Sequence, residues 1–350
     1  MHKRNIMRLV IDSHIPYLEK VFDAVAKVDY LPSEAITPAT TVHADALIIR
    51  TRTLCNAALL AGSAVKLIAS ATIGLDHIDL NYCRQQGIAT VNAPGSNARS
   101  VQQYMASALS FWSKKRGIPL EGKTIGIVGV GCVGRLVQEL ANTLGMTALC
   151  NDPLRCRNEY LPDFVSLAEI AERADIITFH TPLTSDGAFP TFHLANEDFF
   201  NHLKRMPLII NAARGDVVDE QALLRAWQQR KVADFVLDCW HNEPLINDAL
   251  LRASLLGTPH IAGYSADGKA CATRMVVDAV NRFFDMNLPE YDIDLPPQKQ
   301  YCVNRSQLPD LFLQTYAIER DSDMLKTHPD RFETFRRHYP VRREICFSVR

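Results

Sequence analysis

The stretch Lys123-Thr-Ile-Gly-Ile-Val-Gly-Val-Gly-Cys-Val-Gly-Arg135 decides the fold of this chain. Five residues of strand character, 124–128, run directly into three spaced glycines. The apolar residues that follow, over 135–144, recur with the period of a helix. The sequence therefore predicts a buried strand, a tight turn and a helix in immediate succession.

Each glycine of this stretch has a separate physical role. Gly129 allows the turn, Gly131 lets the backbone approach a pyrophosphate, and Gly134 lets the helix pack closely on the strand. Unpaired amide groups and the helix dipole favour an anion at the helix N-terminus. We therefore expect a dinucleotide at this turn, although a plain strand-to-helix turn is the alternative.

A carboxylate follows the glycines at a useful distance. A second expected strand, 147–150, ends in Asn-Asp-Pro, which places Asp152 18 residues after Gly134. This spacing is typical of a carboxylate that binds the ribose hydroxyls and repels the 2′-phosphate of NADP, so NAD is the expected cofactor. Arg155 and Arg157 follow closely and leave NADP open, and Asp152 could instead only cap a turn or helix.

The composition excludes several classes of protein. With 350 residues, 47% of them hydrophobic, the chain can form two or three domains with ordinary cores. The formal charge of −1 gives no general attraction to nucleic acid or anionic membranes. No apolar run reaches the ~20 residues that span a bilayer, and residues 1–7 lack an apolar secretory region, so we expect a cytoplasmic protein. The nine cysteines are singly spaced, so we expect reduced thiols and no metal site.

Residues 7–120 alternate short apolar runs with helical stretches, which is typical of α/β folds. The expected strands include 8–11, 46–49 and 65–70, and the expected helical stretches are 17–26 and 57–61. Polar residues follow three strand ends, at 12–14, 50–53 and 71–77. Ligands bind beyond the carboxyl ends of parallel strands, so Arg50 to Thr53 could bind a phosphate or carboxylate. Solvent-facing arginines are the alternative.

The second half repeats this pattern. Polar residues follow each expected strand, in the segments 180–184, 211–215, 238–243 and 258–263. We predict two Rossmann-like, doubly wound parallel-sheet domains and a small C-terminal α+β segment. The expected lid or substrate domain is 1–97 completed by the helix 268–287, the expected NAD-binding domain is 98–267, and the expected dimerisation segment is 288–350.

The tail differs from the rest of the chain. Prolines mark a linker, and the remainder mixes aromatic rings with charge, ending in the run 335–343. The segment is too short to form a comfortable domain by itself. It therefore packs on the rest of the chain or on a partner subunit, and we expect the partner.

Three residues at the strand ends form a candidate catalytic set. Oxidation of a secondary alcohol needs a base, and His260 has a suitable pKa range. Glu243 would orient and stabilise the imidazolium, and Arg214 would bind a substrate carboxylate. His77, His180 and His241 are the competing bases, but none has an evident carboxylate partner at a strand end.

The glycine stretch, Asn-Ala-Ala-Arg214-Gly, Asp238-Cys-Trp-His-Asn-Glu243-Pro and Thr-Pro-His260-Ile-Ala-Gly-Tyr264 resemble the D-isomer-specific 2-hydroxyacid dehydrogenases over about residues 7–287. The resemblance implies catalytic roles for Arg214, Glu243 and His260. It implies substrate contacts by Thr51, Thr72 and Tyr264. It implies cofactor contacts by Gly129, Gly131, Cys132, Val133, Gly134, Asp152, Thr181, Ala212, Ala213, Arg214, Asp238 and Gly263. Thr51 and Cys132 stand where the family often has Ser and Asn, and neither change removes a catalytic group.

Further details resemble a narrower bacterial branch that oxidises a phosphorylated 2-hydroxy acid in vitamin B6 synthesis. These are Ala-Thr72-Ile-Gly-Leu-Asp-His77, Phe179-His-Thr-Pro-Leu, and the tail run Arg336-Arg-His-Tyr-Pro-Val-Arg-Arg343. That branch implies a C-terminal dimerisation segment and therefore a homodimer. Two alternatives stay open: a dehydrogenase for 3-phosphoglycerate, glycerate or another D-2-hydroxy acid, and a non-catalytic protein that senses NAD.

Overall fold

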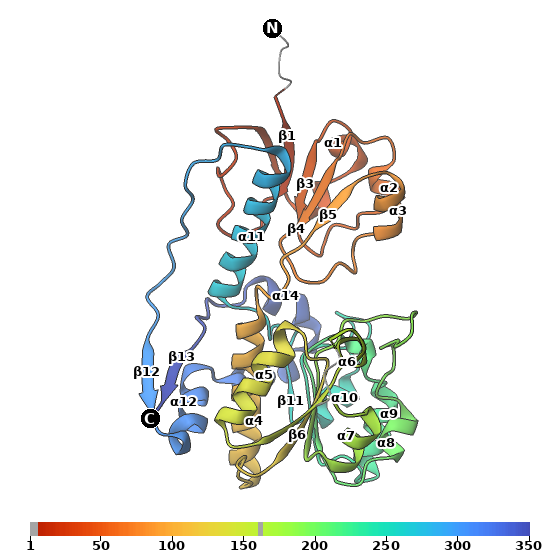
Figure 1. Cartoon of the computed structure of the whole chain (residues 1–350), viewed down its shortest axis with the longest axis vertical. Helices are drawn as coiled ribbons and strands as arrows, with labels where there is room; N and C mark the ends of the chain where they lie inside the picture. Colours follow the sequence, from red (N-terminus) through yellow and green to blue (C-terminus); the bar gives the residue numbers. More distant parts are fainter. Residues whose placement is uncertain (1–5, 160–163) are drawn as a thin grey trace. The chain divides into compact units, whose positions relative to one another are not determined.

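The computed structural model describes residues 6–159 and 164–350, and it divides into two compact units (Figure 1). Unit 1 comprises Met1–Asn97 and Ser265–Pro297, and unit 2 comprises Ala98–Tyr264 and Gln298–Arg350. The first five residues of the expected lid domain, and residues 160–163 of the expected NAD-binding domain, lie outside the described part. Among the described residues, no helix is long and apolar enough to cross a membrane.

Unit 1 is built on a five-stranded parallel sheet with the order β2-β1-β3-β4-β5. Its strands are β1 Arg8–Asp12, β2 Lys27–Leu31, β3 Ala46–Ile49, β4 Leu67–Ser70 and β5 Ala89–Val91. Its helices are α1 Pro38–Thr41, α2 Ala57–Leu60, α3 Leu80–Gln85 and α11 Ala266–Phe284. The apolar face of α11 completes one core of the sheet through Val276, Val277 and Val280. This helix therefore belongs to unit 1, although it follows most of unit 2 in the sequence.

One expected helix of unit 1 does not form. The segment 17–26 is a series of turns, and Tyr17 and Lys20 have left-handed backbone angles, with φ of 62° and 66°. Leu18 and Phe22 are nevertheless buried in the unit 1 core. The apolar spacing therefore marked buried residues correctly, but the prediction of a helix was wrong, since the two left-handed backbone angles are incompatible with a right-handed helix.

Unit 2 is built on a six-stranded parallel sheet with the order β11-β10-β9-β8-β6-β7. Its strands are β6 Thr124–Val128, β7 Thr147–Asn151, β8 Ile176–Phe179, β9 Leu208–Asn211, β10 Asp234–Leu237 and β11 Leu256–Gly257. Its helices before the tail are α4 Ala98–Arg116, α5 Cys132–Thr143, α6 Pro153–Glu159, α7 Leu167–Arg173, α8 Glu197–Asn201, α9 Glu220–Gln228 and α10 Asp248–Ala253. The two parallel sheets confirm the predicted fold class.

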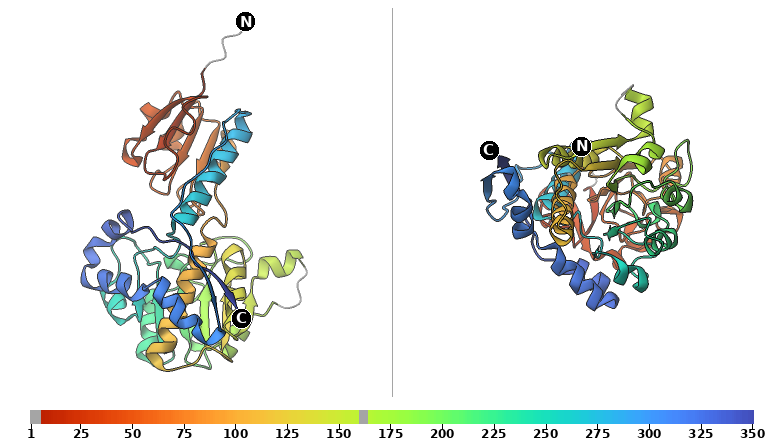
Figure 2. Two further views of the ribbon diagram at one scale, coloured as in Figure 1. Left: turned by 90° about the vertical axis from the view of Figure 1, so that its left-hand side faces the viewer. Right: turned by 90° about the horizontal axis from the view of Figure 1, so that it is seen from below.

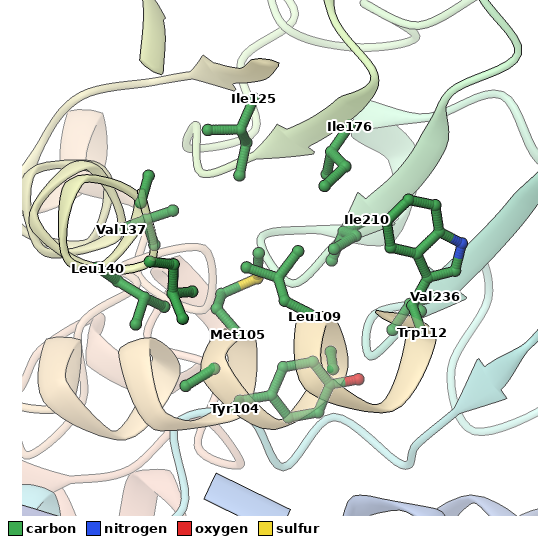
Figure 3. Close-up of a cluster of buried hydrophobic side chains, with 14 of the residues drawn as sticks. Tyr104, Met105, Leu109, Trp112, Ile125, Val137, Leu140, Ile176, Ile210 and Val236 are labelled. Atoms are coloured by element: carbon green, nitrogen blue, oxygen red, sulfur yellow. The ribbon is translucent and has the colours of Figure 1, made fainter. Parts of the chain in front are cut away.

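The long helix α4 anchors the sheet of unit 2. Figure 3 shows its side chains directed toward the strands and toward α5; the cluster includes Tyr104, Met105, Leu109, Trp112, Ile125, Val137, Leu140, Ile176, Ile210 and Val236. The hydroxyl of Tyr104 is also paired with Thr258 Oγ1 at 2.8 Å. Full burial of each large apolar side chain contributes about 1.5–3 kcal/mol to the free energy of folding, so this layer stabilises the sheet whose strand ends carry the polar loops.

The C-terminal segment packs on unit 2 rather than standing apart from it. It contains β12 Gln300–Val303, α12 Leu308–Thr315, α13 Ile318–Thr327, α14 Phe332–Arg337 and β13 Cys346–Val349, and the two strands are parallel neighbours. The helices α12 and α13 lie along α4 and β11 on the outer side of the unit (Figure 2). Phe312 and Phe332 are 0% and 1% exposed. The sequence favoured a partner subunit for this burial, but the chain's own unit 2 provides it.

Candidate active site

The glycine turn has the backbone that its sequence predicts. Gly129 follows β6 with a φ of +88°, and a Cβ there would lie 2.8 Å from the carbonyl carbon of His180. A Cβ on Gly134 would lie 2.1 Å from Gly129 O, so the helix and the turn can approach only without it. A Cβ on Gly131 would meet no described atom within 4 Å. The chain's own packing thus requires glycine at 129 and 134, whereas the space beside Gly131 is open among the described residues.

Polar groups around this turn fit a dinucleotide. Thr181 lies against Gly129, and its hydroxyl oxygen is buried with no hydrogen-bond partner among the described residues. An unpaired buried hydroxyl costs free energy unless a ligand bonds to it, which supports its expected cofactor contact. Cys132 is exposed at the first turn of α5, whose N-cap is Gly131. When bound there, the nicotinamide of NAD would accept a hydride from a substrate alcohol.

Asp152 lies directly beside the glycine turn. Its carboxylate accepts hydrogen bonds from the amides of Val130 and Arg155, each at 3.0 Å. The Arg155 guanidinium donates to Val130 O at 2.6 Å and pairs with Glu159 at 2.7 Å. The charge of Arg155 is therefore already partnered, which weakens the case for a 2′-phosphate beside it. Asp152 stays the predicted partner of the ribose hydroxyls.

The expected base and its carboxylate partner lie together at the end of the sheet. His260 follows β11 and Glu243 follows β10, and His260 Nδ1 is 2.8 and 3.0 Å from the two carboxylate oxygens of Glu243. Glu243 Oε1 also accepts a hydrogen bond from the amide of Trp240 at 2.9 Å. Because Nδ1 is held by the carboxylate, Nε2 is the nitrogen that can exchange a proton with a substrate.

The charges around His260 favour its protonated form. Burial by itself would lower the pKa of His260, but the neighbouring Glu243 carboxylate raises it well above its ordinary value. Burial also raises the pKa of the Cys239 thiol, so this group is neutral near pH 7 and Glu243 provides the charge. Burial opposes ionisation of Glu243 as well, yet His260 holds its pKa below the ordinary value. The resting pair is therefore imidazolium and carboxylate.

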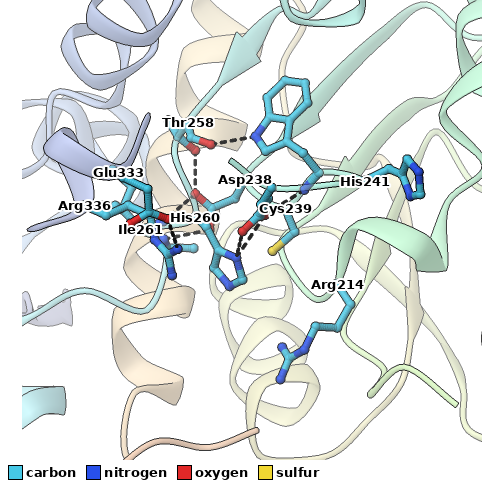
Figure 4. A network of polar contacts seen from close by, with 12 residues as sticks. Arg214, Asp238, Cys239, His241, Thr258, His260, Ile261, Glu333 and Arg336 are labelled. Carbon is cyan, nitrogen blue, oxygen red and sulfur yellow. Dashed lines mark hydrogen bonds and ion pairs between the residues drawn. The ribbon is translucent and has the colours of Figure 1, made fainter. Parts of the chain in front are cut away.

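Asp238 holds the backbone that carries His260. Its buried carboxylate accepts hydrogen bonds from the amides of Ile261 and Ala262, each at 2.8 Å, and from the Thr258 hydroxyl at 2.7 Å (Figure 4). His260 itself has a φ of 55°, a left-handed angle that a non-glycine residue adopts only under constraint. The resemblance assigns Asp238 to the cofactor, whereas in the structure both of its oxygens bind this loop.

Arg214 comes from a third strand end. Asn211, the last residue of β9, donates to Arg214 O at 2.8 Å and accepts from the amide of Ala213 at 3.1 Å, which fixes the turn. The Arg214 side chain donates to Ala213 O at 2.8 Å. Figure 4 shows its guanidinium on the same side of the sheet end as the His260 ring. The structure therefore brings the three predicted catalytic residues together within unit 2.

The competing histidines have different surroundings. The imidazole of His77 is paired with Ser70 in unit 1, and that of His180 with Thr178 in unit 2. His241 does have a carboxylate partner, Asp216 Oδ1 at 2.5 Å, so the sequence argument against it was wrong on this point. However, 65% of the His241 side chain is exposed, so this pair is solvated rather than enclosed.

The expected substrate residues are divided between the units. Thr51 is exposed in the loop after β3, and Thr72 follows β4 with its hydroxyl 2.7 Å from Ser70 Oγ. Tyr264 lies in unit 2, four residues after His260. Arg50, considered above for a phosphate, forms hydrogen bonds of 2.9 and 3.2 Å with buried Asp12. Arg50 therefore has a structural ion pair inside unit 1.

One group among the described residues has the spacing of a metal site. Ligand atoms of Cys239, Glu243 and His260 all lie within 4.8 Å of one another. These atoms are already bonded, His260 to Glu243 and the thiol to Ala213 O at 3.3 Å. This arrangement is that of an oriented acid–base pair with a neighbouring neutral thiol, and the proposed chemistry below uses it in that form.

Comparison with known proteins identifies the class. Residues 96–262 match the model of the D-isomer specific 2-hydroxyacid dehydrogenase, NAD binding domain, which confirms the NAD prediction for this region. A solved structure of D-lactate dehydrogenase from Aquifex aeolicus, complexed with NAD and lactic acid, superposes with a TM-score of 0.67 at 25% identity, covering 79% of this chain and 95% of that one. The fold and the cofactor domain are those of this class of dehydrogenases.

Curated relatives narrow the family. Erythronate-4-phosphate dehydrogenase of Bacteroides fragilis is 48% identical over 97% of both chains. The enzyme of the same name from Escherichia coli O81 is 38% identical over 97% of this chain and 92% of its own. The chain belongs to the family of the erythronate-4-phosphate dehydrogenases.

The sequence reasoning missed functional neighbours in the tail. Arg336 lies over the Tyr264 ring, with 6.0 Å between guanidinium carbon and ring centroid, and its charge acts on Glu243. Arg342 contacts the backbone that follows His260. The basic run 336–343 was noticed in the sequence, but it was assigned only to dimerisation. Long-range packing, which no local pattern encodes, places these arginines beside the candidate active site.

Proposed function

We propose that this protein uses NAD to oxidise the 2-hydroxyl of 4-phospho-D-erythronate to the 2-oxo acid, a step of vitamin B6 synthesis. The observation that carries the chemistry is the His260–Glu243 pair, 2.8 Å apart at the sheet end that also carries Arg214. The substrate is proposed because the relatives that match nearly the whole chain carry that name.

The chain's own residues supply binding and proton transfer. Arg214 binds the substrate carboxylate by charge-assisted hydrogen bonds and orients the alcohol carbon. In the oxidation, His260 must first lose its proton, which alkaline pH favours because the pKa of His260 is raised. Its neutral Nε2 then takes the hydroxyl proton as the C–H hydride leaves for the cofactor, so the alcohol becomes a ketone. Glu243 stabilises the imidazolium that forms. Thr51, Thr72 and Tyr264 remain the proposed contacts to the rest of the substrate.

The test is NADH formation by the purified protein with 4-phospho-D-erythronate, beside 3-phosphoglycerate, D-glycerate and D-lactate. A 2-oxo acid that consumes NADH is supplied in a parallel reaction, in case the cofactor stays bound. We expect a clear preference for 4-phosphoerythronate. Activity only with another hydroxy acid would keep the mechanism and reject the substrate. If NAD binds but all four acids are inert, the NAD-sensing alternative replaces the enzyme.

We also propose a cytoplasmic homodimer. All nine cysteines are free, which suits a reducing compartment. Deletion of the tail would uncover Phe312 and Phe332, which are core residues of unit 2, so the dimer is better tested on the whole chain. Light scattering should give twice the chain mass of 39.2 kDa. A mass equal to one chain at micromolar concentration would reject the dimer.

A further inference from the structure

The C-terminal tail contacts the loop of His260 through one buried arginine. Arg342 Nε donates to Tyr264 O at 2.9 Å, and Arg342 Nη2 donates to Ala262 O at 2.9 Å and to Ile261 O at 3.3 Å. Arg342 is only 8% exposed. Three of the four carbonyls directly after His260 are therefore bound by a residue about 80 positions later in the chain.

A cage of tail residues fixes this guanidinium. Its carbon lies 4.1 Å from the ring centroid of Tyr316 and 5.8 Å from that of Tyr339. Both tyrosine hydroxyls donate to Asp321 Oδ2, at 2.9 and 2.8 Å, and this carboxylate supplies a counter-charge to Arg342. Stacking and a planar set of donors are properties of arginine that lysine does not share.

The loop is thus held from two directions. Asp238 binds the amides of Ile261 and Ala262, and Arg342 binds the carbonyls of the same two residues. A left-handed φ of 55° at His260 persists only when its surroundings over-determine it. We propose that Arg342 is a positioning residue of the active site, which keeps the His260 imidazole in contact with the Glu243 carboxylate.

This assignment gives the tail a role in catalysis within its own subunit. Without the Arg342 bonds, the carbonyls of Ala262 and Tyr264 lose this donor, while Ile261 O keeps only the amide of Tyr264 at 2.8 Å. The loop can then relax from the strained angle at His260. A displacement of about 1 Å is enough to weaken a catalytic contact strongly. Among the described residues, the charged or titratable groups that face the pair include Asp238 and Cys239 toward His260, and Arg336 and Glu220 toward Glu243. None of them replaces the bonds that Arg342 makes.

The experiment compares Arg342→Lys and Arg342→Met with Arg337→Met, an exposed arginine at the end of α14. The first readout needs no substrate: the pKa of His260 is measured by NMR titration of its ring proton, assigned with His260→Asn. In both Arg342 variants we expect this pKa to fall toward the ordinary value of about 6.5, because the contact with Glu243 loosens. The Arg337 variant should match the wild type.

The second readout is turnover, which rests on the proposed function. We expect kcat to fall about tenfold or more in Arg342→Lys, while the dissociation constant of NADH stays within about twofold. Wild-type protein that turns over no hydroxy acid would reject the proposed function, and the NMR comparison would still decide the role of Arg342. If Arg342→Met does not fold, Tyr316→Phe, which removes one bond to Asp321 and keeps the ring, takes its place. An unchanged His260 pKa in folded variants would overturn the proposal.

Discussion

The ends of β8 and β11 each carry a histidine within the same sheet, yet their surroundings drive the two pKa values in opposite directions. His180 has the hydroxyl of Thr178 as its partner, and burial lowers its pKa to about 3. His260 has the carboxylate of Glu243, which raises its pKa despite burial. Removal from water favours the neutral imidazole in both, so the nearby negative charge decides the difference.

The two strand ends consequently have different tasks. The backbone of His180 and the side-chain methyl group of Thr181 pack against the glycine turn, where a neutral, compact residue suffices. The end of β11 presents a histidine beside a carboxylate, which is the arrangement that the proposed proton transfer needs. The sheet provides fixed strand ends at β8 and at β11. The residues of the loop after each strand determine whether that end packs on the glycine turn or carries the proposed base.

The largest expected effect separates the two histidines directly. His260→Asn removes the base, so kcat should fall by about 10²–10⁴-fold, while NADH binding measured by fluorescence is kept. His180→Gln keeps a neutral polar side chain and should change kcat by less than about tenfold. Equal losses in the two variants, at equal folded fraction, would contradict the assignment of the base.

The next effect follows from the charge of Glu243. Glu243→Gln should lower kcat by about 10–100-fold and should lower the pKa of His260. Because His260 accepts a proton in the oxidation, wild-type kcat/KM should rise with pH into the alkaline range, following the raised pKa of His260. In the variant this rise should move to lower pH. The pH profile of kcat/KM for oxidation is measured for the wild type and for the variant. If the rise occurs at the same pH in both proteins, Glu243 does not set the pKa of His260.

A third change tests the packing role of the β8 end. Gly129→Ala places a methyl group 2.8 Å from the His180 backbone at a φ of +88°, so both stability and NADH affinity should fall. Gly131→Ala meets no described atom of the chain, so it should keep the melting temperature within a few degrees and lose mainly NADH affinity. Thermal unfolding and NADH titration distinguish the two. Similar melting temperatures for both variants would show that His180 does not restrict the turn.

The smallest effect is the pH dependence of stability from His180. Its pKa is about 3 in the folded state and about 6.5 in the unfolded state, so the folded protein binds fewer protons between these values. Stability from this residue is complete above pH 6.5 and declines toward pH 3, by at most about 1.4 kcal/mol per pH unit. The free energy of unfolding, measured with denaturant at pH 7 and pH 5, should therefore decrease less between these pH values for His180→Gln than for wild type. An equal loss would mean that His180 is hydrated.

Some parts of the site were readable because neighbouring residues encode them. The glycine turn needs particular backbone angles and close contacts within a few residues, so Gly129 and Gly134 are enough to predict it from the sequence. The proximity of the proposed catalytic residues was predictable because residues at the ends of parallel strands meet at one edge of the sheet. His260 and Glu243 were paired on that basis, and their atoms are 2.8 Å apart.

One helix prediction failed, and one charged residue gained an unforeseen partner, because distant packing acts beside local pattern. Residues 17–26 have helical spacing, but the backbone turns at Tyr17 and Lys20 while Leu18 and Phe22 still reach the core. Arg50 was considered for a phosphate, and the structure adds its pairing with buried Asp12 on a neighbouring strand. Local periodicity and residue type do not specify which distant group will satisfy a charge or bury a ring.

By itself, the sequence determined two parallel-sheet units, an NAD turn and a histidine–carboxylate pair, because glycine geometry, strand periodicity and residue chemistry are local properties. Only the tertiary structure decided that Asp238 and Arg342 hold the His260 loop from two directions, and that Phe312 and Phe332 are buried by their own unit. These contacts join residues that are far apart in the chain. They depend on how the sheet and the tail pack, which no short stretch of sequence encodes.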